Sequence, residues 1–337
     1  MTSFSSIEYN RERLLALPNV SLDETLTIPA ESLATFRLNN RHGDVQIIGK
    51  DTDVIEVAYS ITVFADSEEM AIKYLSELTL NQTEPPEQLD LSVQQPAKPL
   101  TVRSVRTNFI VYLPHSLHVL LESNHGETVL ENLHAGVEVT LQHGRDLQVR
   151  NISEEANFDV SHSSGEIQDL KGNLVLSSTH SQLSLDRVQG CLDLSARHSN
   201  LDIQDVAGNV NFVAGHDQIN FRRVAGFLQG ASSHSDICAT GLESDIDISG
   251  RYGTVRLLDT TGSIIVSGRH TLIDVELRDV AKGYTVLLRT DRANVNSNLE
   301  LDVSETDRNR KTHVGVVKAG QHNVRVKAEY GSIHLNL

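Results

Sequence analysis

Histidine recurs through the middle of this sequence at a nearly constant interval. The series runs at steps of eighteen or nineteen residues and is continued by Tyr252 and His270; it comprises His125, His143, His162, His180, His198, His216 and His234. If each repeat stacks on the next as neighbouring strands about 4.8 Å apart, adjacent imidazoles would be close enough to share a Zn²⁺ or Cu²⁺ ion. A second hypothesis is a ladder of turn residues, because histidine tolerates left-handed backbone better than most residues. We favour the turn ladder, with a metal ion or another ligand as alternatives.

A histidine ladder of this kind would respond to pH. Two protonated imidazoles about 4.8 Å apart repel each other by roughly 1 kcal/mol in water, and by more near protein. The sequence therefore predicts that the pKa of the ladder histidines is depressed. It also predicts that the protein loses stability below about pH 6.

The other polar residues do not form a known catalytic pattern. Several acids could suggest paired carboxylates for glycoside cleavage or a calcium site; they are Asp186, Asp193, Asp202, Asp205, Asp236 and Asp247. Asp193 and Asp202 alternate with apolar residues, so we expect them to point outward as solvated charge that discourages edge association. Cys191 and Cys238 should be unpaired thiols. We expect no catalytic residues, no cofactor and no metal ion.

The apolar residues share the phase of the histidines. Within each repeat they pair two positions apart, as in Leu201-x-Ile203 and Val210-x-Phe212, which is the period of a strand with one buried face. Stacked repeats would pair each strand in parallel with the same strand of the next repeat. The sequence therefore predicts an all-β fold, a single-chain parallel β-helix or solenoid with coils of about eighteen residues. Glycines at 172, 190, 208 and 226 are expected at tight corners that need positive φ.

The two ends depart from this phase. Residues 1–115 should form a strand-rich cap with one helix near 67–78, begun by a capping box of Asp66 and Glu69. Residues 116–290 should form the regular solenoid, and residues 291–337 the C-terminal coils with a polar insertion at 306–311. We expect all three segments to make one continuous solenoid. The segments Arg41-His42-Gly43 and Tyr330-Gly331 repeat the corner motif at either end.

The order of these elements resembles a known family. An acidic helix at 66–78 is followed by the strand Asn108-Phe-Ile-Val-Tyr-Leu-Pro114, then by Ser123-Asn124-His125-Gly126 and the coils. This order is similar to that of the bacterial putative-adhesin family, a domain of unknown function with β-strand repeats, from about residue 30 to the end. The resemblance implies a β-helix-like fold and no established reaction. The family commonly has Asn-Gly at the corner, whereas the predicted ladder of this chain has His-Gly only at His125 and His143.

Composition restricts the classes of function. The chain has 337 residues, a formal net charge of -16 and two cysteines. The acidic balance argues against nucleic acid as a ligand, because binding to its phosphates requires clustered Lys and Arg. No run of about 18 apolar residues predicts a transmembrane segment. The N-terminus has neither the charged start nor the apolar core of a secretory signal, so we expect a cytoplasmic protein.

These observations favour a binding role. We expect a non-catalytic β-solenoid of the putative-adhesin type, a scaffold that presents a rigid repetitive surface to a protein partner or for self-assembly. One alternative is a cell-surface adhesin exported by a non-classical route. Another is a histidine-ladder binder of divalent metal ions. An enzyme that acts on polysaccharides is the least favoured, because the coils are uniform and the chain has no Trp to stack on sugars.

Overall fold

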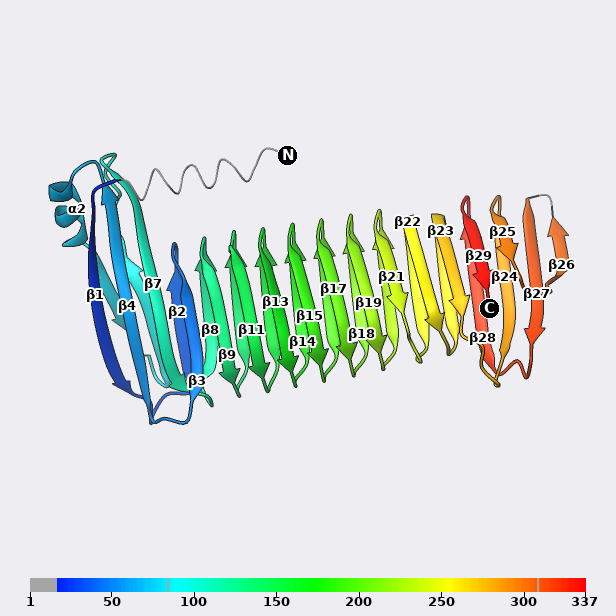
Figure 1. The fold of residues 1–337 in the computed structure, drawn as a ribbon, viewed down its shortest axis with the longest axis horizontal. Helices are drawn as coiled ribbons and strands as arrows, with labels where there is room; N and C mark the ends of the chain where they lie inside the picture. The colour runs from blue at the N-terminus through cyan, green and yellow to red at the C-terminus, as the bar shows by residue number, and fades with distance from the viewer. Residues whose placement is uncertain (1–16, 84, 308) are drawn as a thin grey trace. The chain divides into compact units, whose positions relative to one another are not determined.

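Among the residues that the structure describes, most lie in strands and one short helix accompanies them (Figure 1). The computed structural model describes residues 17–83, 85–307 and 309–337. Its mostly β, largely parallel pairing confirms the predicted class and is consistent with a solenoid. The chain forms two compact units, one ending at Ser153 and the other running from Glu154 to Leu337. We call them unit 1 and unit 2 and describe each by itself.

Unit 1 begins with an antiparallel sheet. Strand β4 (Val54–Ala65) pairs on one side with β1 (Asn19–Pro29) and on the other with β7 (Val102–Pro114). The helix α2 (Glu68–Leu75) packs against β4 and β1, and it buries Ala71 and Tyr74. The predicted helix is therefore present, but the predicted capping box is wrong. The N-cap is Ser67, whose hydroxyl accepts a hydrogen bond from the backbone N–H of Met70 at 3.4 Å, whereas Asp66 is bound by Arg103.

The rest of unit 1 is built mainly from parallel strand pairs, together with the antiparallel pair of β5 and β6. The remaining strands are β2 (Thr35–Asn40), β3 (Val45–Lys50), β5 (Thr79–Thr83), β6 (Gln88–Gln94), β8 (His118–Asn124), β9 (Glu127–Leu133), β10 (Val137–Gln142) and β11 (Asp146–Ile152). Strand β2 lies between β6 and β8, and β3 lies between β7 and β9. The early coil formed by β2 and β3 is thus inserted among strands that come later in the sequence (Figure 1).

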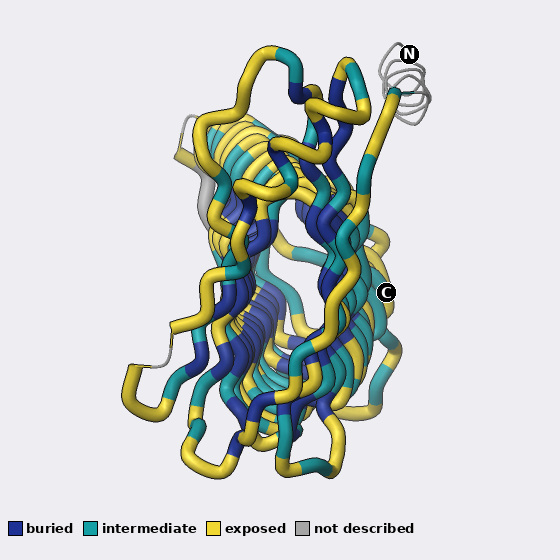
Figure 2. The backbone as a smooth tube through the Cα atoms, turned by 90° about the vertical axis from the view of Figure 1, so that its left-hand side faces the viewer, coloured by how far each residue is buried: buried dark blue, intermediate teal, exposed yellow. Residues whose placement is uncertain are grey.

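Unit 2 repeats one pair of strands along most of its length. The strands are β12 (Ala156–Ser161), β13 (Ser164–Leu170), β14 (Leu174–Thr179), β15 (Gln182–Val188), β16 (Leu192–Arg197), β17 (Asn200–Val206), β18 (Val210–Gly215), β19 (Gln218–Val224), β20 (Leu228–Ser233), β21 (Asp236–Thr240), β22 (Ile246–Thr260) and β23 (Ile264–Leu277). Leu201 pairs in parallel with Ile219, and Val210 with Leu228, so in both cases the partner lies eighteen positions later. The predicted apolar columns are buried on the inside of the coils, while exposed residues lie outside (Figure 2).

The glycine column has a different role from the one predicted. Gly190 and Gly208 do not have positive φ. A Cβ atom at Gly208 would lie 2.5 Å from the carbonyl oxygen of Gly190 in the preceding coil. Glycine is needed here because the backbones of successive coils approach closely at this corner. The left-handed positions are instead taken by the ladder histidines and, at a second corner, by residues such as Asp169 and Arg187.

The C-terminal coil of unit 2 is also inserted out of sequence order. The last strands are β24 (Tyr284–Asp291), β25 (Asn294–Ser297), β26 (Asp302–Asp307), β27 (Arg310–Val317), β28 (His322–Glu329) and β29 (Ser332–Asn336). Strand β28 runs in parallel between β23 and β24, and β29 between β23 and β25 (Figure 1). The predicted polar insertion at 306–311 forms the facing ends of the antiparallel hairpin of β26 and β27, with residue 308 outside the described residues.

Candidate binding surface

The histidine ladder is a continuous stack of rings within each unit. In unit 2 the stack runs through His162, His180, His198, His216, His234, Tyr252, His270 and Tyr330, with ring centroids 4.7 to 5.1 Å apart and planes within 17° of parallel. In unit 1, His125 stacks on His143 at 5.1 Å and on His42 at 4.9 Å. His42 and Tyr330 were not among the predicted ladder residues, although both stand in copies of the corner motif. Tyr330 stacks on His270 because the inserted C-terminal coil lies next to β23.

The backbone explains why these side chains stack. Except for His42, the ladder residues have φ between 51° and 65°, the left-handed region that the turn interpretation requires. Since every coil turns in the same way, each ring projects in the same direction as the ring of the next coil. The rings are exposed to solvent, but each interior ring has both faces covered by its neighbours. The ladder therefore presents a row of ring edges, and its interior rings cannot act as a platform for a stacked sugar or base.

The thiol and carboxylate side chains noted in the sequence are dispersed among the described residues. Within residues 17–83, 85–307 and 309–337, no group of three or more His, Cys, Asp or Glu side chains is placed to hold a metal ion. Cys191 and Cys238 are free thiols, as predicted. The acids noted in the sequence lie in separate surface contacts: Asp202 pairs with Arg222, and Asp205 with Arg223.

A buried row of oxygen atoms lies beneath the ladder. Ser181 and Ser199 each accept a hydrogen bond, at 3.3 Å, from the backbone N–H of the equivalent residue one coil earlier. Asp217 takes the next position and accepts from the N–H of Ser199 at 2.7 Å, while Ser235 Oγ accepts from the N–H of Asp217 at 3.0 Å. This row satisfies backbone donors that the corner removes from the strand ladder.

Asp217 is the unusual member of this row, and sequence reasoning missed it. The residue is 5% exposed, and burial raises the pKa of its carboxyl group. Hydrogen bonds from Ser199 and Gly215, and the neighbouring His198 and His216, act in the opposite direction. The signal was present in the sequence, because aspartate replaces the serine that follows most ladder histidines from His162 onward.

Two ladder histidines have a depressed pKa. In unit 1, burial lowers the pKa of His42 and of His125, and the adjacent imidazole of the ladder lowers it further in each case. The direction is the one predicted from the sequence for stacked imidazoles. For these two residues, loss of water around the ring contributes more than repulsion between rings.

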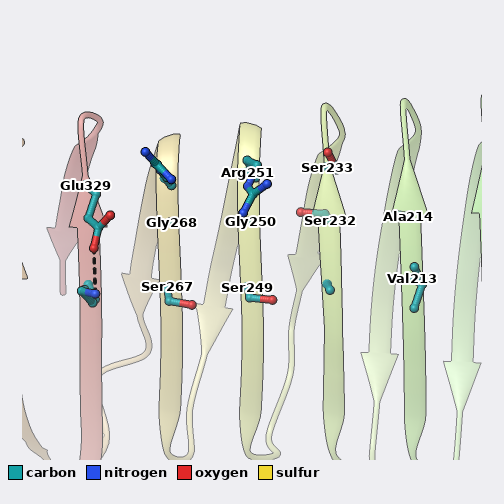
Figure 3. A pocket seen from close by; sticks show the side chains of 13 residues that line it. Val213, Ala214, Ser232, Ser233, Ser249, Gly250, Arg251, Ser267, Gly268 and Glu329 are labelled. Carbon is teal, nitrogen blue, oxygen red and sulfur yellow. Dashed lines mark ion pairs between the residues drawn. The ribbon is translucent and has the colours of Figure 1, made fainter.

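A trough runs beside the ladder on the outer face of unit 2. Its floor consists of small outward residues in register on neighbouring strands, Ala231 on β20, Ser249 on β22 and Ser267 on β23. Arg251 and Arg269 directly precede the ladder residues Tyr252 and His270. The cavity that these groups line has a volume of about 420 Å³, and Figure 3 shows Ser249, Ser267 and Arg251 on its side. The trough continues toward β14, where its lining includes Asp193, Asp247 and the exposed Val213.

The opposite corner of unit 2 carries charge instead of rings. Asp169 is paired with Arg187, and Asp205 with Arg223, both at 2.6 Å. The hydrogen-bonded guanidinium lowers the pKa of each of these aspartates. The aspartates and arginines of this corner neutralise one another, whereas the ring edges and the trough carry polar groups that face solvent. The surface best suited to recognition is therefore the one that carries the rings and the trough.

Comparisons with known proteins give structural likenesses of low similarity. No protein-family model matches the chain, and no curated protein matches it in sequence. In structure it is similar to a "putative cell adhesion protein" from Clostridium sporogenes, at 10% identity and a TM-score of 0.22, covering 94% of this chain and 99% of that one. It is also similar to "putative adhesin" structures from Parabacteroides merdae (13% identity, TM-score 0.30, 76% of this chain and 92% of that one) and Parabacteroides distasonis (10%, 0.25, 94% and 96%). The helices among the described residues include none with the length and apolarity to cross a membrane.

Proposed function

We propose that this protein is a non-catalytic, cytoplasmic β-solenoid with coils of eighteen residues, and that it binds a protein partner or a second copy of itself. Binding takes place through the ring ladder and the adjoining trough of unit 2. The observation that carries this proposal is the stack itself: stacked rings lie 4.7 to 5.1 Å apart along the unit, with their edges in solvent.

Rigidity is the physical basis of such binding. Each ladder residue is fixed by a left-handed corner and by the rings on either side, so that little conformational entropy remains to be lost on association. Arginine at the rim of the trough adds a side chain that is enriched at protein interfaces. A partner would be recognised by the spacing and direction of the ring edges.

The test compares two sets of substitutions on opposite corners of the same coils. In the ladder variant, His180, His198 and His216 are replaced by Asn, which tolerates the left-handed backbone. In the control variant, Asp169→Asn and Arg187→Gln remove the two ion pairs of Arg187, with Asp169 and with Asp186, from the other corner. Each tagged protein is captured from its own cells after separation of cytoplasm, membrane and medium, and bound proteins are identified by mass spectrometry. Self-association is measured by sedimentation equilibrium.

The proposal is supported if a partner, or a dimer, forms with the wild type and the control and is lost with the ladder variant. It is rejected if the ladder variant binds as well as the wild type. It is also rejected if the wild type is monomeric and captures nothing. Recovery from the membrane or the medium would contradict the proposed cytoplasmic location, whatever the outcome of the capture.

A further inference from the structure

The trough of unit 2 contains a cluster of positive charge at one end. Arg251 on β22 and Arg269 on β23 are paired in register, so that the two side chains leave neighbouring strands at the same level. Both are exposed. Within the described part of the chain, no carboxylate lies at ion-pair distance from either guanidinium, but Glu329 on β28 is in register with Arg269, on the side away from Arg251. Lys327 lines the same cavity, and its ammonium group is paired with Glu329 at 2.8 Å (Figure 3).

The arginines at the opposite corner of unit 2 are instead paired with aspartates. There, Arg187 and Arg223 alternate with aspartates along the coils, and each guanidinium is neutralised. At the trough, two like charges stand on adjacent strands, about 4.8 Å apart at the backbone. They repel each other until an anion lies between them. In a protein with a formal net charge of -16, an unpaired pair of arginines is a local reversal of the prevailing charge.

The floor of the cavity is suited to the same kind of ligand. Ser249 and Ser267 lie side by side beneath the arginines and are small enough to leave space above them (Figure 3). Their hydroxyl groups can donate hydrogen bonds to an oxygen anion, while each guanidinium can bind a carboxylate through two parallel N–H groups. The lining of the cavity contains no aromatic ring. A stacked sugar or base would therefore find no platform in it, which favours a peptide carboxylate.

We propose that Arg251 and Arg269, above the hydroxyl groups of Ser249 and Ser267, bind a carboxylate of an acidic peptide segment. The inference rests on the proposed protein-binding function, because it names the chemistry of the partner that this surface takes. The third positive group of the lining, Lys327, remains paired with Glu329. The bound carboxylate takes the place that aspartates hold beside the arginines of the opposite corner.

The probe is a fluorescein-labelled peptide of alternating Ser and Glu, tested by anisotropy against the full chain in low salt and in 150 mM salt. A peptide with Gln in place of Glu controls for charge. The test variant is Arg251→Gln with Arg269→Gln. The matched control is Arg41→Gln with Arg256→Gln, which removes the same charge from exposed positions outside the trough. Circular dichroism checks that both variants are folded.

We expect the Glu peptide to bind the wild type and the control equally and to bind the test variant at least tenfold more weakly. Displacement of the peptide by inorganic sulfate would further support the site, because it would show that the oxyanion itself is recognised. Equal binding of the Gln peptide, or unchanged affinity in the test variant, overturns the inference. If the peptide fails to bind while the wild type captures a partner through the ladder, the proposed function stands and this inference fails.

Discussion

Replacing His125 by Asn should make unit 1 less sensitive to acid. His125 stacks between His42 and His143, with ring centroids 4.9 and 5.1 Å away, so its removal separates the remaining two imidazoles. Asn keeps the left-handed backbone that His125 adopts at φ 55°. The substitution therefore removes a positive charge from the middle of the stack without a change of fold.

The sign of the effect follows from proton binding. The folded pKa values of His42 and His125 lie below the ordinary value of 6.5. As the pH falls through 6.5, the unfolded chain takes up more protons than the folded chain does. The free energy of unfolding of unit 1 therefore decreases with falling pH in this window and is fully retained above it.

The magnitude can be worked from the ring distances. Two unit charges 4.9 to 5.1 Å apart repel by about 0.8 kcal/mol in water, or roughly 1.7 kcal/mol for the two contacts of His125 when all three rings are charged. The dielectric constant of water gives the smallest value for this repulsion, because the partial burial that lowers the pKa of His42 and His125 also strengthens interactions between their charges. Screening with a Debye length of about 8 Å reduces the total to about 1 kcal/mol at 0.15 M salt, and to about 1.4 kcal/mol at 0.01 M.

The assay is urea unfolding at pH 7.5 and pH 5.0 in both salts, followed by hydrogen exchange of peptides from residues 17–153. Between pH 7.5 and pH 5.0, the free energy of unfolding should decrease by about 1 kcal/mol more for the wild type than for His125→Asn at 0.15 M salt. His118→Asn serves as the control, since His118 lies outside the ladder and faces Glu138, and it should not reduce the acid sensitivity. Equal losses for the wild type and His125→Asn in both salts would refute the repulsion argument.

Three further substitutions test the description of unit 2. Burial raises the pKa of Asp217, so the ionised form of this side chain disfavours folding. Asp217→Ser should therefore increase the free energy of unfolding at pH 7. This gain should disappear as the pH falls to about 3.8, which urea titrations at several pH values can show. Gly208→Ala places a Cβ atom 2.5 Å from the carbonyl oxygen of Gly190 and should lower the free energy of unfolding by about 1–3 kcal/mol. Gly215→Ala is the control, because a Cβ atom there would lie 4.0 Å from the nearest atom, and it should leave the free energy of unfolding nearly unchanged in the same experiment. Leu335→Ala, at a fully buried position of β29, should cost about 2–5 kcal/mol and reduce the hydrogen-exchange protection of both β23 and β25.

The repeat was the part of the fold that sequence could predict. Because a shift of one residue in a strand exchanges its inner and outer faces, the apolar columns fix the register wherever they are unbroken. Leu192 therefore pairs with Val210, eighteen positions later, as the columns required. The corner residues followed from the same count, including the stack from His162 to His270.

The ends could not be predicted in the same way. Val324 and Val326 alternate like the residues of any other coil, and this pattern does not say which two strands a coil will lie between. The order in space depends on the connections, such as the antiparallel hairpin that carries the chain from β24 to β28. The role of the glycines and the burial of Asp217 depended on distances between successive backbones, which a residue pattern does not contain.

Within the candidate binding surface, the ladder could be predicted from the sequence, but the trough could not. The histidines were visible because one uncommon residue type recurred in phase. Arg251 and Arg269 are also eighteen residues apart, but arginine is a common surface residue, and only the structure shows that the two lie side by side, with Glu329 in register beside Arg269. Space remains above Ser249 and Ser267 because neither position carries a large side chain.

The insertion of β28 between β23 and β24, and of β29 between β23 and β25, also constrains the order in which unit 2 can fold during synthesis. The ribosome makes residues 264–297 before residues 322–336, yet β24 and β25 reach their final partners only when the later coil has entered. Until then, the parallel edges of β23 and β24 are open to any other strand, including one from a nascent neighbour. Folding of this end therefore cannot keep pace with translation and must wait for the last coil to emerge.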